Sequence, residues 1–151
     1  MSRPKSDPGA LRAEALAADL HTLAGKLKRR LREQASAGDL TPSQTAVLMR
    51  LDREGSMTVT ALARLEGVRS QSMGATVAAL DDLGLVKGSP DPADGRQTIL
   101  SLRPACREMI RSGRAARHEW LLRAIQSKLT AIEQTELAAA MRLLGRIVDA
   151  D

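Results

Sequence analysis

The side chains that most often carry chemistry are few in this chain and lie far apart. It has one cysteine, Cys106, and two histidines, His21 and His118, in 151 residues. A zinc site needs several Cys, His or carboxylate ligands at close spacing, and the sequence does not offer them. It also lacks an HExxH motif, a phosphate-cradling glycine loop and a nucleophile elbow. The sequence therefore predicts no metal, no cofactor and no enzymatic activity.

The charge balance points to a partner rather than to a reaction. The chain has 23 Lys and Arg against 18 Asp and Glu, which gives a formal net charge of +5. This balance favours a polyanion, either nucleic acid or an anionic membrane. No stretch approaches the roughly 20 apolar residues of a membrane span, and no secretion signal is evident. A single cysteine fits a reducing compartment, so we expect a cytoplasmic protein without a membrane partner.

The elements that position a binding surface are expected to be mostly helical. Trp120 is the only aromatic residue, and an aliphatic composition rich in Leu and Ala favours helices. Leucines at three- and four-residue steps over 16–31 predict one long amphipathic helix. Its basic run, 26–32, is interpreted as a solvated face or a DNA-flanking patch. A second helix is predicted over 42–55, with Thr41 as its cap.

The middle of the chain predicts two short helices around a tight turn. The first is expected over 60–66, where it buries Leu62, Ala63 and Leu65. Gly67 is the expected turn residue, because a helix end often needs a left-handed conformation that glycine adopts without strain. The second helix is expected over 70–83.

A hairpin is predicted directly after these helices. The periodicity becomes that of strands at 85–87 and again at 98–102, with a turn-rich segment at 89–95. This loop is longer than the usual two to five residues and is therefore a candidate contact element. Helix, turn, helix and hairpin follow one another in a winged helix-turn-helix. Its second helix fits the DNA major groove, and its hairpin reaches phosphates or the minor groove.

The C-terminal third is predicted to return to helix. Pro104 is expected to begin a long helix that Gly113 interrupts. Thr130 and Glu133 form a capping box for the last helix. Four apolar residues in that helix recur at a 4-3-4 spacing that suits packing against a partner helix: Leu137, Met141, Leu144 and Val148. The expected fold class is mainly α with a small β-hairpin wing.

Three segments resemble a known family: TVTALA at 58–63, DDLGLV at 81–86 and DPADGRQ at 91–97. They are similar to the multiple-antibiotic-resistance regulator (MarR) family, and the Asp-x-Arg spacing in the last segment is the most specific piece. The flanking helical stretches match the family layout, so the resemblance covers nearly the whole chain.

The resemblance implies a sequence-specific transcriptional regulator, in the expected form a dimeric repressor. Residues 1–36 and 104–151 would form an intertwined helical dimerisation region. Residues 41–103 would form a winged helix-turn-helix lobe. Each lobe of the homodimer would read one half-site of a pseudo-palindromic operator in double-stranded DNA.

The resemblance also assigns roles to individual residues. Arg96 matches the wing arginine that enters the minor groove, and Asp94 matches the acid that orients it by a charge-assisted hydrogen bond. The alternative for this pair is an ordinary surface ion pair. Ser70, Gln71 and Ser72 match the start of the recognition helix, where hydroxyls and amides meet phosphates and base edges. For the two serines the alternative is helix capping.

Three further DNA-binding candidates depart from the family pattern. Gly74 and Ala75 stand where longer polar or basic side chains are common, and Lys87-Gly88 replaces a more basic stretch at the start of the wing. A glycine inside a helix costs about 1 kcal/mol relative to alanine, so Gly74 either allows close approach to DNA or is merely tolerated. These departures support an alternative function, a winged-helix protein-interaction module with weakened DNA readout.

A small-molecule effector is a further partner that the resemblance implies. Many family members bind aromatic or phenolic anions between the dimer helices and the DNA-binding lobe. Here the candidate lining residues are His21, Arg50, His118 and Trp120. The alternative is that Trp120 belongs to the core and the others are solvated. Cys106 is interpreted as a structural thiol rather than a redox sensor, because free cysteines are usually buried.

Overall fold

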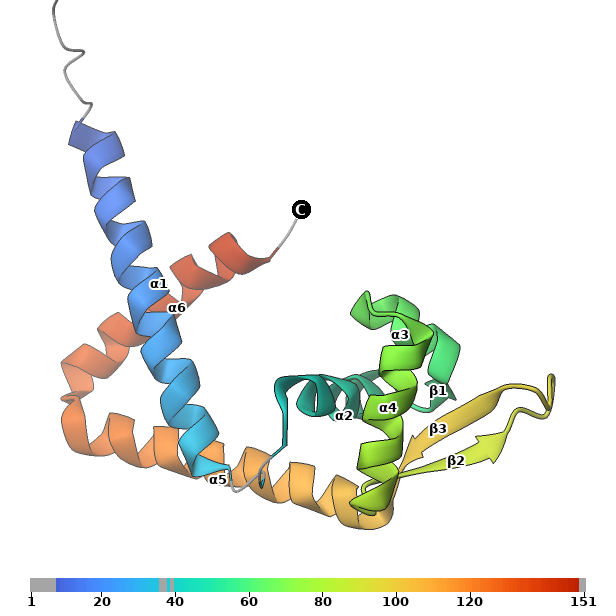
Figure 1. Cartoon of the computed structure of the whole chain (residues 1–151). Helices are drawn as coiled ribbons and strands as arrows, with labels where there is room; N and C mark the ends of the chain where they lie inside the picture. The colour runs from blue at the N-terminus through green and yellow to red at the C-terminus, as the bar shows by residue number, and fades with distance from the viewer. Residues whose placement is uncertain (1–7, 36–37, 39, 150–151) are drawn as a thin grey trace, which may run out of the picture. The chain divides into compact units, whose positions relative to one another are not determined.

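The computed structural model describes residues 8–35, 38 and 40–149 (Figure 1). The chain divides into two compact units. Residues 37–114 form the first, here called the lobe, and residues 1–36 with 115–151 form the second, here called the helical unit. Helix α5 (Pro104–Lys128) begins in the lobe and continues into the helical unit. The fold is mainly helical with one small antiparallel sheet, which confirms the predicted class.

The lobe contains the predicted helix-turn-helix and hairpin. The helices are α2 (Pro42–Glu54), α3 (Val59–Glu66), α4 (Ser70–Asp82) and the start of α5. The hairpin strands β2 (Val86–Pro90) and β3 (Thr98–Leu102) extend away from the helices (Figure 1). The expected two-stranded hairpin is corrected by strand β1 (Met57–Thr58), which pairs with β3 and gives the strand order β1-β3-β2. A two-residue strand is too short to produce a readable alternation.

Local capping chemistry explains where the helices of the lobe begin and end. The Thr41 hydroxyl accepts from the backbone N–H of Gln44 at 3.2 Å, and the Gln44 side chain accepts from the N–H of Thr41 at 2.9 Å. This confirms Thr41 as the predicted cap of α2, and Gln44 completes a capping box with it. Thr58 caps α3 by accepting from Ala61 N–H at 3.1 Å. Gly67 has φ 67° and ψ 29°, the left-handed conformation expected of it between α3 and α4.

The core of the lobe draws on all its helices and on both hairpin strands. Every buried side chain there is apolar or a thiol: Val47, Leu48, Leu51, Leu62, Ala63, Met73, Leu80, Val86, Leu100, Leu102, Cys106 and Ile110. The prediction that Leu65 is buried was wrong, because 48% of it is exposed. Leu65 lies two residues after Ala63, about 200° around the helix, and therefore faces away from the side that Ala63 buries.

The helical unit consists of α1 (Pro8–Gln34), the end of α5 and α6 (Ala131–Val148). Thr130 and Glu133 form the predicted capping box of α6. The backbone N–H and hydroxyl of Thr130 donate to this carboxylate and lower the pKa of Glu133. Helix α5 runs through Gly113, so the predicted interruption was wrong. One glycine costs a helix only about 1 kcal/mol, which a 25-residue helix tolerates.

The described part of the helical unit has no buried residue. In the same described residues, none of the helices has the length and apolar character needed to span a membrane. The leucines that predict an amphipathic α1 are mostly exposed, including Leu16 and Leu23 at 63% each. The apolar faces of this unit are thus present as the sequence predicts, but the described residues leave them largely exposed.

Candidate nucleic-acid interface

Helix α4 presents one face to the core and the opposite face to solvent. Met73 and Leu80 are buried. Gln71, Ala75, Ala78 and Asp82 recur at 4-3-4 spacing and are all exposed. Its 13 residues give a length of about 20 Å, and a helix of about 10–12 Å diameter matches the width of the major groove. The outward face of α4 is therefore the candidate recognition surface.

The two serines at the start of α4 do not cap the helix. The helix begins at Ser70, its N-cap residue is Arg69, and no side-chain capping hydrogen bond is made there. Ser70 and Ser72 are both exposed, in the turn that also carries Gln71. The capping alternative is thus wrong for this chain. Both serines thus belong to the exposed surface at the start of α4.

Gly74 is not required by packing within the chain. A Cβ atom added at this position would meet no atom within 4 Å. Ala75 beside it is exposed as well. Small side chains on this part of α4 therefore leave its backbone exposed. Packing in the core does not explain why the residues here are small.

The wing loop is ordered by hydrogen bonds of its own. The N–H of Asp91 donates to the carbonyl of Gln97 at 3.0 Å, and the N–H of Gln97 donates to the carbonyl of Asp94 at 2.9 Å. The Asp94 carboxylate accepts from the backbone N–H of Arg96 at 3.1 Å. The expected orienting bond to the guanidinium is corrected here, because Asp94 fixes the backbone of Arg96 instead. The exposed Arg96 side chain makes no ion pair with any described residue.

The base of the wing carries the remaining predicted contact residue. Lys87 lies on β2, is exposed, and pairs in register with Ser101 of β3. At the neighbouring Gly88, an added Cβ would lie 2.7 Å from Cγ2 of Thr98. Any larger residue at this position would therefore force the Thr98 side chain to move, which favours glycine in the Lys87-Gly88 pair.

Arg103 is a positioning residue that sequence reasoning missed. Its Nε donates to the carbonyl of Val86 at 2.8 Å, and its Nη2 lies 3.2 Å from Oδ1 of Asp81. Its backbone N–H also donates to the carbonyl of Leu85 at 3.0 Å. One arginine thus joins the end of α4 to the base of the wing, the two elements that would enter DNA. No local spacing reveals this contact, because 22 residues separate Arg103 from Asp81.

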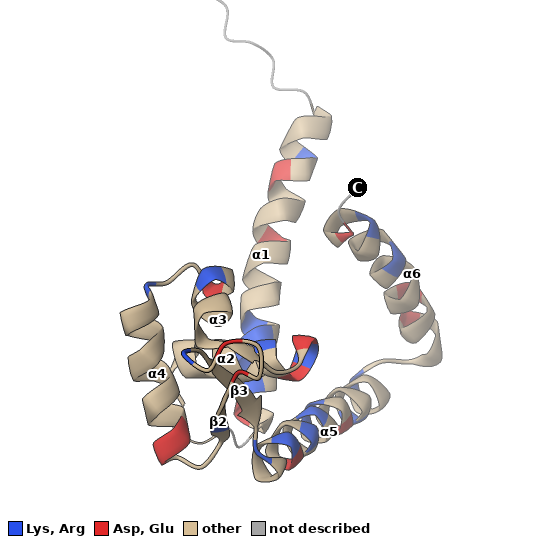
Figure 2. Cartoon of the chain, turned by 90° about the vertical axis from the view of Figure 1, so that its right-hand side faces the viewer, with Lys and Arg blue, Asp and Glu red and all other residues tan. Residues whose placement is uncertain are grey.

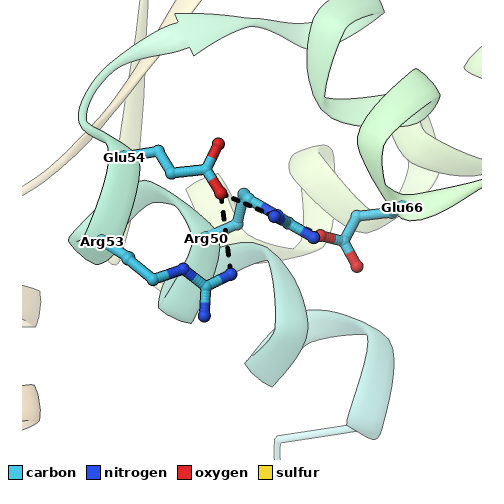
Figure 3. A network of polar contacts seen from close by, with 4 residues as sticks. All are labelled: Arg50, Arg53, Glu54 and Glu66. Atoms are coloured by element: carbon cyan, nitrogen blue, oxygen red, sulfur yellow. Dashed lines mark hydrogen bonds and ion pairs between the residues drawn. The ribbon is translucent and has the colours of Figure 1, made fainter. Parts of the chain in front are cut away.

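Arg50 joins α2 to the end of α3 (Figure 3). Its Nε donates to Glu66 at 2.7 Å and its Nη1 donates to Glu54 at 2.6 Å. The hydrogen bond to Glu54 has the largest effect in raising the pKa of Arg50, and the bond to Glu66 has the next largest. The hydrogen bond from Arg50 in turn lowers the pKa of Glu54. Arg53 lies 3.7 Å from the same Glu54 oxygen. This network fixes the residue that precedes the Gly67 turn and so helps to orient α4.

The four predicted effector residues lie in both units. His21, His118 and Trp120 belong to the helical unit, and Arg50 belongs to the lobe. The lobe has a cavity of about 320 Å³ between α2, the turn after α3 and α4. Ser72, Met73 and Thr76 line it, whereas none of the four candidates does.

Cys106 is fully buried. Burial is the main cause that raises the pKa of its thiol, and the negative charge of Asp52 is the second.

Charge is unevenly distributed over this interface. Helix α4 has no Lys or Arg and ends in Asp81 and Asp82 (Figure 2). The cations that accompany it are Arg69 at its cap, Lys87 on the wing and Arg96 at the wing tip. Among the described residues, no group of three or more His, Cys, Asp or Glu is placed to hold a metal ion.

Comparisons with known proteins agree with this geometry. Residues 38–97 match the model of the MarR family. An HTH-type transcriptional regulator of Mycobacterium bovis is 37% identical over 134 residues, which cover 89% of this chain and 93% of that protein. The crystal structure of a Pseudomonas aeruginosa transcriptional regulator, 36% identical, has a TM-score of 0.79 and covers 93% of this chain and 98% of that one.

A more distant structure resembles the chain in fold. A mutant of Staphylococcus aureus MepR bound to an oligodeoxyribonucleotide is 13% identical, has a TM-score of 0.71, and covers 89% of this chain and 98% of that one.

Proposed function

The chain belongs to the MarR family of winged helix-turn-helix transcriptional regulators, and we propose that it acts as a homodimeric repressor. It is thus a DNA-binding regulator and not an enzyme. In this proposal residues 1–36 and 104–151 form the dimerisation region and residues 41–103 form the DNA-binding lobe, with Cys106 and Ile110 at the start of α5 also packed in the core of the lobe. Each lobe places α4 in the major groove and Arg96 in the adjacent minor groove of one half-site.

The observation that carries the dimer is the exposed apolar surface of the helical unit. Of the thirteen large hydrophobic residues that are exposed in the described chain, ten belong to this unit. Burying a fully exposed side chain of this kind contributes about 1.5–3 kcal/mol, and these residues, 41–76% exposed, contribute a corresponding part of it. A second copy is the natural partner, since a twofold interface places the same apolar surface on both sides.

Repression follows from occupancy of a promoter by this dimer. Two lobes on one face of the duplex would cover half-sites about one helical turn apart. The test is gel retardation with DNA from just upstream of the protein's own coding sequence, in the presence of excess unrelated DNA. Arg96→Ala is expected to weaken binding about 5- to 150-fold, because a groove-reading arginine contributes about 1–3 kcal/mol.

The matched control is Arg107→Ala, which removes an exposed arginine of α5 that makes no ion pair with a described residue. It should bind as the parent does. If Arg96→Ala also binds as the parent does, the assignment of the wing is wrong. Weak retardation that excess unrelated DNA abolishes would instead support the protein-interaction module.

Release by a small-molecule effector completes the proposal. Salicylate serves as the probe, because it is a phenolic anion of the class that the family resemblance implies. It should release the bound DNA from the parent, while His118→Ala should need a higher concentration. If salicylate does not change DNA binding, this phenolic anion is not an effector of the protein. The proposal of a DNA-binding repressor would be unaffected.

A further inference from the structure

The positive charge of the chain is concentrated in one short segment of α1. Residues 26–33 hold five basic residues and one acid, a net +4 out of the +5 of the whole chain. The lobe, residues 37–114, holds ten basic and nine acidic residues, a net +1. The remaining positions balance. We define the basic segment as Lys26, Lys28, Arg29, Arg30 and Arg32; it forms the blue band on the C-terminal half of α1 (Figure 2).

The basic segment is exposed and only partly neutralised. Arg29 and Arg30 share one carboxylate, that of Glu33, at 4.0 and 3.3 Å. Their side chains are nevertheless 68% and 65% exposed. Three cations, Lys26, Lys28 and Arg32, are exposed and have no ion pair with a described residue. Most of this charge is therefore free to meet an external anion.

The lobe lacks the charge that a DNA-binding surface normally carries. Five of its ten cations already form ion pairs within the lobe: Arg50, Arg53, Arg103, Arg111 and Arg114. The recognition helix contributes no cation and two aspartates. Neutralising phosphates supplies most of the sequence-independent affinity for DNA. A lobe with a net +1 leaves much of that contribution to another part of the molecule.

We propose that the basic segment of α1 binds backbone phosphates of the same duplex that the lobes read, outside the base-contacting half-sites. The inference rests on the proposed DNA-binding function and adds an element to it. The segment would supply affinity and salt dependence, whereas α4 and the wing would supply base readout. Its contribution should therefore be the same on operator and on unrelated DNA.

An anionic membrane is the competing polyanion, and the proposed burial of the apolar face of α1 in the dimer disfavours it. At 100° per residue, the positions 26, 28, 29, 30 and 32 leave one arc of about 160° without a cation, and Leu23, Leu27 and Leu31 lie in that arc. A helix that lies in a lipid surface keeps its cations on one polar face and buries the other. In the proposed dimer the apolar face of α1 packs against the second copy and is not available to lipid, whereas the cationic side stays open to phosphates.

The test compares two triple variants with the same loss of charge. Lys26→Gln, Lys28→Gln and Arg32→Gln together remove the cations of α1 that have no ion pair. Lys128→Gln, Arg142→Gln and Arg146→Gln remove three exposed cations of α5 and α6 in the same unit. Glutamine keeps the helix propensity of both triples. Affinity is measured against KCl concentration on the upstream duplex and on an unrelated duplex of equal length.

The α1 triple should lower the slope of log K against log salt by about 0.9 for every phosphate that the variant no longer neutralises, up to about 2.7 for each chain. The operator-to-unrelated affinity ratio should not change. The control triple should retain the parent slope.

Equal slopes for both triples and the parent would overturn the inference, as would an equal reduction in both triples, which would indicate net charge alone. If all three proteins have the same DNA slope, and the parent but not the α1 triple cosediments with phosphatidylcholine–phosphatidylserine vesicles, the basic segment binds a membrane instead. A parent that binds neither duplex would instead refute the proposed function.

Discussion

The lobe and the helical unit are made from similar aliphatic side chains, yet they handle them differently. All twelve buried residues of the described chain lie in the lobe, and most of the large exposed ones lie in the helical unit. The lobe therefore has a core of its own within one chain. The helical unit has amphipathic faces without a core, which is the pattern of an element that becomes stable by association.

The excess positive charge lies in the helical unit, whereas the buried core lies in the lobe. The lobe, which presents the candidate base-reading surface, is almost neutral, while one segment of α1 holds nearly all the excess positive charge. The comparison suggests that recognition and affinity for DNA are supplied by different parts of the chain. If the two units are independent in this way, a change in one unit should leave the role of the other intact.

The largest effect is expected from a polar residue on the apolar face of α1. Leu23→Asp places a charge where 63% of the leucine is exposed in the single chain and where a partner is proposed to cover it. A twofold dimer contains the change twice, so the loss is about 3–6 kcal/mol, at least 100-fold in the dimer dissociation constant. Sedimentation velocity would measure the shift to monomer.

The control for this variant is Leu65→Asp, an exposed leucine of the lobe. It should leave the dimer intact. If Leu65→Asp dissociates the dimer and Leu23→Asp does not, the dimer interface lies on the lobe and not on the helical unit.

A somewhat smaller effect is expected in the core of the lobe. Leu62 is fully buried, and truncation of such a leucine to alanine leaves a cavity that costs about 2–5 kcal/mol. Leu62→Ala should lower the urea midpoint of the lobe, with little change in dimer dissociation measured in the absence of urea. Dissociation as complete as that of Leu23→Asp would show that the units are not independent.

Arg103→Lys should have a moderate effect that appears in DNA binding more than in stability. Lysine keeps the charge but cannot donate to Val86 and Asp81 with the fixed fork of arginine. We expect a loss of about 1–2 kcal/mol in operator affinity, with an unfolding midpoint close to that of the parent. Footprinting should show that protection by the wing is lost before protection by α4; an unchanged footprint would argue against a positioning role.

The smallest effect is expected at Gly74. The added methyl of Gly74→Ala has open space around it among the described residues, so the helix should gain about 1 kcal/mol of stability. If DNA approaches α4 closely at this point, operator affinity falls while stability rises. Thermal unfolding and gel retardation on the same sample distinguish close approach from a merely tolerated glycine, for which affinity is unchanged.

Much of the fold could be predicted because its signals are local. Capping residues such as Thr41 and Thr130, and the turn at Gly67, act within a few residues of the chain. Strand β1 was missed because two residues carry no period. The position of Leu65 was missed because the inward face of a short helix depends on what packs against it.

Less of the candidate site could be predicted from the sequence, because several of its contacts are not local. Exposed positions on α4 and the wing follow from helix and strand periodicity and from the family resemblance. The contact of Arg103 with Asp81 and the partners of Arg50 in α3 depend on tertiary packing, which sequence spacing does not encode. Likewise, Asp94 bonds the backbone of Arg96 rather than its guanidinium because the loop folds on itself.

The most direct test of a dimer that reads DNA through its wings is a hydroxyl-radical footprint of the parent and of Arg96→Ala on the upstream duplex. We predict two protected half-sites whose centres lie about 10 base pairs, or a multiple of that, apart. Arg96→Ala should lose the minor-groove protection in both half-sites while Arg107→Ala keeps it. A single unpaired region of protection, or a footprint that Arg96→Ala leaves intact, would contradict the proposal.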